Sequence, residues 1–362
     1  MSSIGYYQIN RSANESVSST ASAIVYISKR LGLNHFKTSE PSKFDRIREL
    51  RAIGENVYPS YLFEPQMHSP DSAHHLANVS KQKIIDCNES GFFNEWISDE
   101  YGFRNPSHQI QSGFDFLLIG DSFTEGACEN DNETIAGVLR QKGYTVANLG
   151  RGGSGPLFQL GSLVEYGSTY SANKIIWIVF TGNDLLNLRE EKIGILRGYL
   201  DPSFSQNLVE KKDSHDVALK AYLDEEYRRN LKRLREGIGY PRTRAYGETL
   251  DVIEALEKER HLLLAVAQRI LIESKKLNAT LNIVIINHYA YSHELQDITS
   301  LTMQQFASSE GIPLLEFSRA YLIKNRKLFT SKGPHFNREG YQRVGEAISD
   351  WTGKSEEDLV RY

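Results

Sequence analysis

Cysteine is scarce in this sequence, since Cys87 and Cys128 are the only two among 362 residues. Two thiols cannot by themselves form a disulfide framework or a zinc site, so a small cross-linked fold is excluded. The pair permits at most one bridge. Two reduced thiols are the state that we expect.

Long apolar runs and an excess of positive charge are missing as well. No stretch approaches the ~18 apolar residues of a membrane-spanning helix, so no membrane span is predicted. The first residues contain no basic region followed by an apolar core, which predicts a cytoplasmic protein without a signal peptide. Lysine and arginine number 42 against 46 acidic residues, a net charge of −4. This balance offers no basic surface for nucleic acid, and none is expected as a partner.

The remaining composition is that of a globular protein, with 40% hydrophobic and 24% charged residues. The length suggests about two domains of roughly 150 residues, or one large domain with an appendage. We predict a flexible tail over residues 1–20 and an N-terminal extension over 21–112 that packs on the main domain. The main domain is predicted over 113–354 and a C-terminal tail over 355–362.

Two segments of the extension have their own character. Residues 45–53 predict a short helix. Aromatic and turn-forming residues alternate without helical period over 54–106, which predicts irregular structure with short strands. These aromatic side chains would suit stacking on sugars, but packing against the main domain is the interpretation that we favour.

From residue 114 onward, continuous apolar runs alternate with amphipathic segments. This alternation predicts an α/β fold in which a five-stranded parallel sheet is covered on both faces, in three α/β/α layers. The ligand site of such a sheet lies at the carboxyl ends of the strands. The strands are predicted over 114–120, 144–150, 174–180, 281–287 and 312–317, and the helices over 131–142, 156–166, 297–310 and 338–351.

A helical insert at about residues 205–277 interrupts this alternation. Residues 224–236 are highly charged, with acid-to-base pairs four apart that support an exposed helix. Residues 249–277 predict a longer amphipathic helix. A helical hairpin packed on the domain edge is the simpler interpretation, and a lid or a partner-binding arm is the alternative.

Two glycine-containing loops follow the first two predicted strands. Ser122 stands in G-D-S-F-T-E-G at 120–126, where its hydroxyl would be presented at the edge of the sheet, as a nucleophile requires. Asn148 opens N-L-G-R-G-G at 148–153. The second loop is not a dinucleotide loop, because it follows the wrong strand and lacks the third glycine, and no Walker-type phosphate loop occurs.

Two further polar residues follow later strands. Asn183 in T-G-N-D at 181–184 carries an amide that could donate to a developing negative charge. His335 in P-H-F-N at 334–337 precedes the last helix, from which it could reach a serine and act as general base. Each of these segments alone is explained as well by a turn, a cap or an exposed side chain.

Taken together and in this order, the four segments resemble the SGNH, or GDSL-type, hydrolase family, over about residues 114–351. The resemblance implies a flavodoxin-like fold and an esterase that needs no cofactor and no metal. It implies that Ser122 is the nucleophile and His335 the base. The backbone N–H groups of Ser122 and Gly153 and the side-chain amide of Asn183 would then form the oxyanion hole.

The sequence departs from this family at one position. The family usually places an aspartate three residues before the histidine, and Lys332 stands there instead. Either another acid reaches His335 through space, with Asp184 as one candidate, or a backbone carbonyl orients the ring in a Ser–His dyad. The third possibility is a weakened site that is kept for binding.

The run S-D-E-Y-G-F-R-N-P at 98–106, together with T-G-N-D-L at 181–185, resembles SGNH proteins associated with bacterial polysaccharide assembly. That resemblance implies a carbohydrate ester, with an acetyl group as the expected acyl group, as the substrate. An O-acyltransferase using the same site is one alternative, and a catalytically weak carbohydrate-binding or scaffold protein is another.

Three other polar residues could also contribute to a site. Arg151 in the glycine loop could meet an acidic substrate. His288 and His293 follow the fourth predicted strand and could line a pocket. The pair at 74–75 has no partner at metal-ligand spacing, so we expect exposed histidines there.

Overall fold

The computed structural model describes residues 42–61, 74–107, 113–236 and 250–353. Both predicted tails and residues 21–41 lie outside these ranges, so the predicted domain boundaries stay predictions. None of the described helices is both long enough and apolar enough to cross a membrane.

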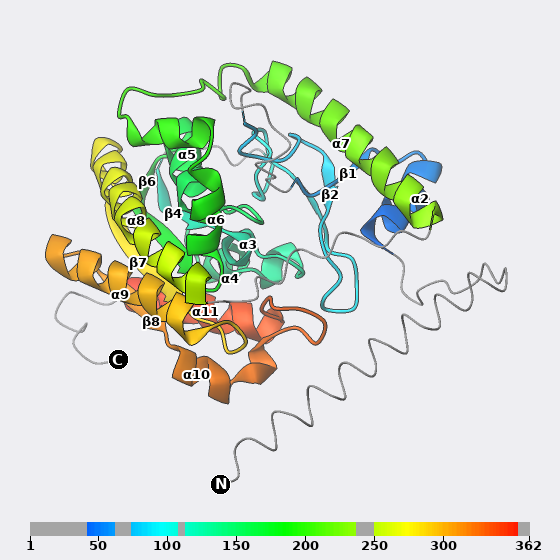
Figure 1. Cartoon of the computed structure of the whole chain (residues 1–362). Helices are drawn as coiled ribbons and strands as arrows, with labels where there is room; N and C mark the ends of the chain where they lie inside the picture. The colour runs from blue at the N-terminus through cyan, green and yellow to red at the C-terminus, as the bar shows by residue number, and fades with distance from the viewer. Residues whose placement is uncertain (1–41, 62–73, 108–112, 237–249, 354–362) are drawn as a thin grey trace, which may run out of the picture. The chain divides into compact units, whose positions relative to one another are not determined.

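A five-stranded parallel sheet forms the centre of the described structure (Figure 1), as the sequence predicts. Its order is β5-β4-β6-β7-β8, so the second strand lies outside the first and the later strands extend the other edge. This is the flavodoxin-like order, whose switch point lies between β4 and β6. The strands are β4 (Phe114–Gly120), β5 (Val146–Asn148), β6 (Ala172–Phe180), β7 (Thr280–Ile286) and β8 (Leu314–Phe317).

Alternate strand residues serve two separate cores. Leu117 and Ile119 of β4 belong to one apolar cluster, whereas Phe116 and Leu118 belong to the other. Because side chains alternate across a strand, both faces of the sheet must be covered. The first face is covered by α5 (Pro156–Tyr166), α6 (Asp184–Glu191), α8 (Leu250–Lys276) and α9 (His293–Glu310), and the second by α4 (Ile135–Gln141), α10 (Arg319–Lys324) and α11 (Arg338–Gly353).

Helix boundaries differ from the predicted ones where polar side chains cap the helices. The helix predicted over 131–142 divides into a short η2 (Asp131–Glu133) and α4, because the Thr134 hydroxyl accepts from the Gly137 N–H at 3.0 Å. Helix α9 begins four residues earlier than predicted, because Ser292 caps it. The strand predicted over 144–150 is reduced to the three residues of β5.

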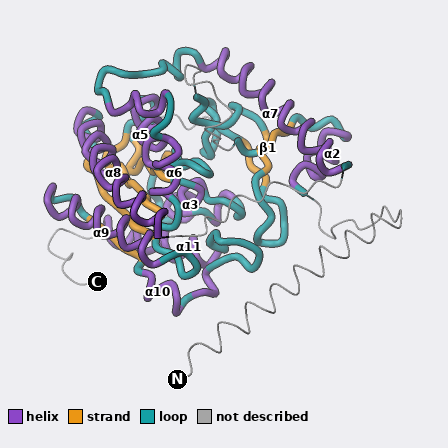
Figure 2. The backbone as a smooth tube through the Cα atoms, viewed as in Figure 1, coloured by secondary structure: helices purple, strands orange, loops and turns teal. Residues whose placement is uncertain are grey.

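The extension contributes a second, smaller sheet, seen beside the main one in Figure 2. It consists of β1 (Val57–Pro59), β2 (Lys83–Ile85) and β3 (Glu95–Ile97), with β1 parallel and β3 antiparallel to β2. Helices α2 (Lys43–Ala52) and α7 (Lys212–Arg235) pack on it. Tyr58, Tyr61 and Trp96 are buried in its core, so these aromatic side chains serve packing rather than sugar stacking.

The two helices of the insert lie in different layers, so the predicted helical hairpin is wrong. Leu219 and Leu223 of α7 are buried against the aromatic residues of the small sheet. Leu263 and Ile270 of α8 are buried in the main core instead. Helix α7 therefore packs on the small sheet of the extension. The charged residues of α7 gave no sign of this packing.

We expect Leu223→Ala to lower the free energy of unfolding by about 2–5 kcal/mol, because it leaves a cavity beneath α7. The control is Val217→Ala on the same helix, where the side chain is 69% exposed and the change should stay within about 0.5 kcal/mol. Urea denaturation measures both. Equal, small effects would show that α7 is an undocked arm.

Candidate active site

Ser122 lies at the carboxyl end of β4 as the first residue of the short helix α3 (Ser122–Glu125). Asp121 caps this turn, since its carboxylate accepts from the Phe123 N–H at 2.9 Å. Gly126 ends it in a left-handed conformation, with φ of 84°. Burial raises the pKa of Asp121 to about 7. The strand, cap and glycine together fix the serine at the switch point of the sheet.

His335 meets this serine across 213 residues of sequence, with Nε2 2.9 Å from Ser122 Oγ. The histidine lies on the loop before α11. Phe329 and Phe336 form an antiparallel bridge at the base of this loop, and the Thr330 N–H donates to the His335 carbonyl at 2.9 Å. The structure thus brings together the two residues that the sequence places as nucleophile and base.

The other ring nitrogen of His335 faces Glu89, which lies between β2 and β3 in the extension. His335 Nδ1 is 3.0 Å from Glu89 Oε1, and the His335 backbone N–H donates to Oε2 at 3.2 Å. The Thr330 hydroxyl also donates to Oε2, at 3.0 Å. Of the three explanations for Lys332, the first therefore holds: another acid reaches the histidine through space.

Gly333 explains how the carboxylate of a distant segment fits beside the histidine loop. A Cβ atom built on Gly333 would overlap the carboxyl group of Glu89. Because Gly333 has no side chain, the carboxyl group of Glu89 occupies this space. Lys332, one residue earlier, is exposed. Sequence reasoning missed Glu89 because it stands in no motif, and this glycine was the one available signal.

The charges of the pair stabilise each other. Burial lowers the pKa of His335, but the hydrogen bond and the negative charge of Glu89 outweigh burial and raise it above its ordinary value of 6.5. Burial raises the pKa of Glu89, and its contacts with His335 outweigh that effect and lower the pKa. Glu89 is therefore a carboxylate at neutral pH.

Asp184 is not the substitute acid that the sequence suggested. Its carboxylate accepts from the Phe180 N–H at 2.9 Å and from Gln159 at 3.3 Å. It is fully buried behind β6, where burial raises its pKa. Asp184 therefore holds the backbone of the loop that carries Asn183.

Gly153 and Asn183 follow β5 and β6, the two strands that flank β4. The Gly153 N–H makes no hydrogen bond within the described residues, and its φ of 73° favours glycine. The side-chain amide of Asn183, whose NH2 group is the donor, also makes no hydrogen bond with the described residues. Both groups therefore keep hydrogen-bonding capacity at the edge of the sheet that presents Ser122.

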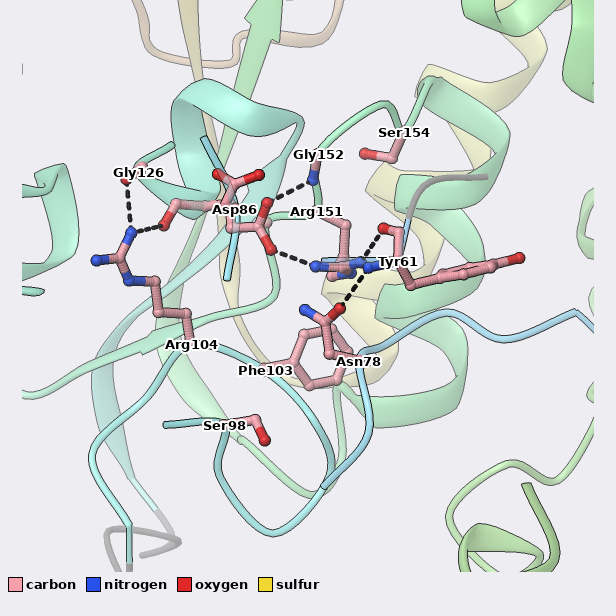
Figure 3. A network of polar contacts seen from close by, with 12 residues as sticks. Tyr61, Asn78, Asp86, Ser98, Phe103, Arg104, Gly126, Arg151, Gly152 and Ser154 are labelled. Atoms are coloured by element: carbon pink, nitrogen blue, oxygen red, sulfur yellow. Dashed lines mark hydrogen bonds and ion pairs between the residues drawn. The ribbon is translucent and has the colours of Figure 1, made fainter. Parts of the chain in front are cut away.

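The glycine loop is fastened to the nucleophile turn by a buried ion pair (Figure 3). Arg151 and Glu125 are paired, with side chains 1% and 2% exposed. Glu125 also accepts from the Gly152 N–H at 2.8 Å, and Arg151 donates to the Tyr61 carbonyl at 2.5 Å. Arg151 is thus a structural residue, and its predicted contact with an acidic substrate is wrong.

The run at 98–106 joins the extension to the same turn. Arg104 donates to the carbonyls of Gly126 and Glu129, at 2.6 Å each. Asp99 is buried and accepts from the Phe103 N–H and the Tyr170 hydroxyl. This segment, which carried the resemblance to proteins of polysaccharide assembly, holds the extension beside Ser122.

The other histidines do not line the site as the sequence suggested. His288 is buried, with Nε2 3.0 Å from the Pro334 carbonyl, so it supports the loop that carries His335. Burial lowers the pKa of His288 to about 4. His293 meets Arg319 at the surface, 2.6 Å away. At 74–75, the expectation of exposed histidines is wrong for His74, which is buried, and His75 lies 3.4 Å from His215.

Cys87 and Cys128 form a disulfide, so the expectation of two reduced thiols is wrong. Their Cα atoms are 5.1 Å apart, within the usual range for such a bond. The sequence could not show this, because 41 residues separate the two. The bridge ties the segment of Glu89 to the segment that follows Ser122.

We expect Arg151→Met to lower the free energy of unfolding by about 3–5 kcal/mol, because it leaves Glu125 as an unpaired buried charge. The matched control is Arg46→Met, which removes the partly exposed pair with Glu95 and should cost about 0–1 kcal/mol. Chemical denaturation compares the two. Equal losses would contradict a structural role for the buried pair.

Comparisons with known proteins identify the family of this chain. The model of the GDSL-like lipase/acylhydrolase family matches residues 116–348, and no curated protein matches the chain. Similar solved structures include a lipase/acylhydrolase from Enterococcus faecalis (13% identity, 66% of this chain and 94% of that one, TM-score 0.38). Others are the esterase EstA from Pseudoalteromonas sp. (12%, 67% and 100%, 0.37) and an acetyl-xylooligosaccharide esterase from Geobacillus stearmophilus (13%, 70% and 99%, 0.38). At such low identity, the substrates of these proteins do not transfer to this chain.

The family match covers more than half of the chain, which therefore belongs to the GDSL-like lipases and acylhydrolases, a family of carboxylic ester hydrolases.

Proposed function

We propose that this chain is a serine esterase in which Ser122, His335 and Glu89 form the catalytic relay. The observation that carries the proposal is the continuous contact from Ser122 Oγ through both ring nitrogens of His335 to the Glu89 carboxylate. Such an arrangement activates a hydroxyl for attack on a carbonyl carbon. The reaction needs no cofactor.

The steps of ester hydrolysis follow from the protonation states of Ser122, His335 and Glu89. Nε2 of His335 takes the proton of Ser122 as the oxygen attacks the ester carbonyl, and Glu89 stabilises the resulting imidazolium. The Ser122 and Gly153 N–H groups and the Asn183 amide are proposed to bind the oxyanion, each being worth about 3–4 kcal/mol. The imidazolium then protonates the leaving alcohol, and water releases the acyl group by the same steps.

Glu89 bears directly on the alternative of a catalytically weak binding protein. That alternative was motivated by Lys332, which replaces the usual acid in the histidine loop. Because Glu89 now supplies a carboxylate at His335 Nδ1, the motive for it falls away. A hydrolytic role is the better explanation of the geometry.

For the substrate, we propose an acyl ester of a carbohydrate, with acetyl as the acyl group. Its support is the sequence resemblance at 98–106 and 181–185. An O-acyltransferase would use the same residues and replace water by a sugar hydroxyl. Incubation with an acetyl ester, with and without an oligosaccharide acceptor, separates the two, since transfer in excess of hydrolysis identifies the transferase.

The predicted cytoplasmic location stays a prediction, and one feature weighs against it. Disulfides persist mainly in oxidising compartments, and the Cys87–Cys128 disulfide would be stable in such a compartment. Thiol labelling of protein from intact cells would decide between the two locations.

We expect Ser122→Ala to abolish ester hydrolysis, with a loss on the order of 10⁵–10⁶-fold, and to prevent labelling by a fluorophosphonate. The control is Ser203→Ala at an exposed turn, which should leave both readouts unchanged. Turnover of a chromogenic acetyl ester and mass spectrometry of the labelled chain measure them. Unchanged turnover in Ser122→Ala would refute the proposed nucleophile.

Glu89→Gln should lower kcat on the order of 10⁴-fold, because the ring loses the acid that fixes its tautomer. The pH profile should change as well. His335 acts when neutral and its pKa is raised by Glu89, so the acid limb of the wild type should lie above pH 6.5. In Glu89→Gln it should move to lower pH.

Glu95→Gln in β3 is the matched control, because its carboxylate pairs with Arg46 on the small sheet. It should keep the wild-type profile of kcat/KM against pH. Thermal unfolding of both variants checks that the fold is intact. An unshifted acid limb in Glu89→Gln would contradict the role of Glu89.

A further inference from the structure

Four side chains of metal-binding type meet on the side of His335 that faces away from Ser122. They are Cys87, Glu89, Cys128 and His335, and one ligand atom of each lies within 4.8 Å of the others. Cys128 Sγ is 3.6 Å from His335 Nδ1, which is itself 3.0 Å from Glu89. Among the described residues, this is the one such cluster of three or more.

The two sulfur atoms are joined to each other in the structure and therefore cannot act as thiolate ligands. Other contacts hold the segments that carry them. The Asn94 N–H donates to the Cys87 carbonyl at 3.0 Å, and the Asn94 amide donates to the Glu129 carbonyl at 2.7 Å. The Tyr341 hydroxyl donates to the Ala127 carbonyl at 2.9 Å. The thiols would thus stay close together after the bond is broken.

We propose that reduction of the Cys87–Cys128 disulfide creates a zinc site formed by both thiolates, the Glu89 carboxylate and His335 Nδ1. A dithiol supplies two electrons and two protons to the disulfide and becomes a cyclic disulfide itself. Binding of Zn²⁺ then displaces the two thiol protons to solvent. Two sulfurs, a nitrogen and an oxygen make the four-coordinate set that zinc prefers.

Three of the four ligands are partly exposed, and Cys128 is buried beneath them. The side chains of His335 and Glu89 are each 18% exposed, so an ion can enter from solvent. Thiolate ligands favour zinc over magnesium or calcium, which bind oxygen. The site is therefore specific for a thiophilic divalent cation and exists only in the reduced protein.

Zinc at this position would inhibit ester hydrolysis, a consequence that rests on the proposed function. A neutral imidazole bound to metal through Nδ1 carries its proton on Nε2. Nε2 then donates to Ser122 Oγ and cannot accept the serine proton. Glu89 is withdrawn from the ring at the same time. One ion thus fixes the inactive tautomer.

The first experiment measures metal binding and needs no activity. The full chain is prepared oxidised, and also reduced with dithiothreitol that is then removed without air. Zinc per chain is measured after equilibrium dialysis, and cobalt(II) is used as a spectroscopic probe of thiolate ligands. We expect one zinc per reduced chain, none per oxidised chain, and a thiolate-to-cobalt absorption band in the reduced protein alone.

Two variants test whether the two thiolates are ligands of the zinc. The double variant Cys87→Ser/Cys128→Ser should bind no zinc under either condition. The control is His215→Ala, which removes a histidine that lies 3.4 Å from His75 outside the cluster and should bind zinc as the wild type does. Equal zinc in reduced and oxidised protein, or undiminished zinc in the double variant, would overturn the proposed site.

The second experiment measures ester hydrolysis by the reduced wild type with a chelator and with zinc. We expect zinc to lower turnover on the order of 10⁴-fold, as a wrong tautomer does, and a chelator to restore it. Zinc bound without loss of turnover overturns the proposed inhibition. Zinc bound by a chain that is inactive in every state refutes the proposed function and leaves the zinc site standing.

Discussion

The hydrogen bond between Glu89 and His335 is the contact on which the rest of this molecule depends. It joins a residue of the extension to a residue of the last loop, 246 positions away. A carboxylate held at 3.0 Å from Nδ1 requires that the extension be positioned about as accurately as the sheet itself. The buried contacts of Asp99, Arg104 and Arg151 serve that requirement. They explain why an irregular, strand-poor segment is so densely hydrogen-bonded.

The same requirement accounts for the buried charge around the nucleophile. Arg151 and Glu125 are nearly inaccessible, and a buried ion pair is seldom a source of net stability. Its value here is geometric, because it links the Tyr61 carbonyl of the extension to the glycine loop and the Ser122 turn. Arg104 links the same turn to the run at 98–106. These polar bonds fix the alignment of the extension on the sheet, in addition to the apolar packing of Leu76 and Phe103 in the main core.

Much of this structure could be predicted from local sequence. The strand at 114–120 and the helix at 156–166 have the predicted bounds, because apolar runs and an N-terminal proline are local signals. Ser122 and His335 were predicted because each stands at a motif beside a sheet edge. Glu89 and the cysteine pairing were not, since both are contacts between segments far apart along the chain. The placement of α7 failed for a similar reason: its buried face of Leu219 and Leu223 is narrow beside its many charges.

The acid that contacts His335 need not stand in the same motif as the histidine. Here Lys332 occupies the usual position of the acid, and Glu89 approaches from another segment beside Gly333. The segment that matches the family, residues 116–348, holds the serine and the histidine but not the glutamate. A fragment cut at those boundaries would lack the carboxylate that contacts His335 Nδ1. A sequence search that requires an acid inside the histidine loop would classify this chain among inactive hydrolases. A bare glycine in that loop is a reason to search elsewhere in such chains for the missing carboxylate.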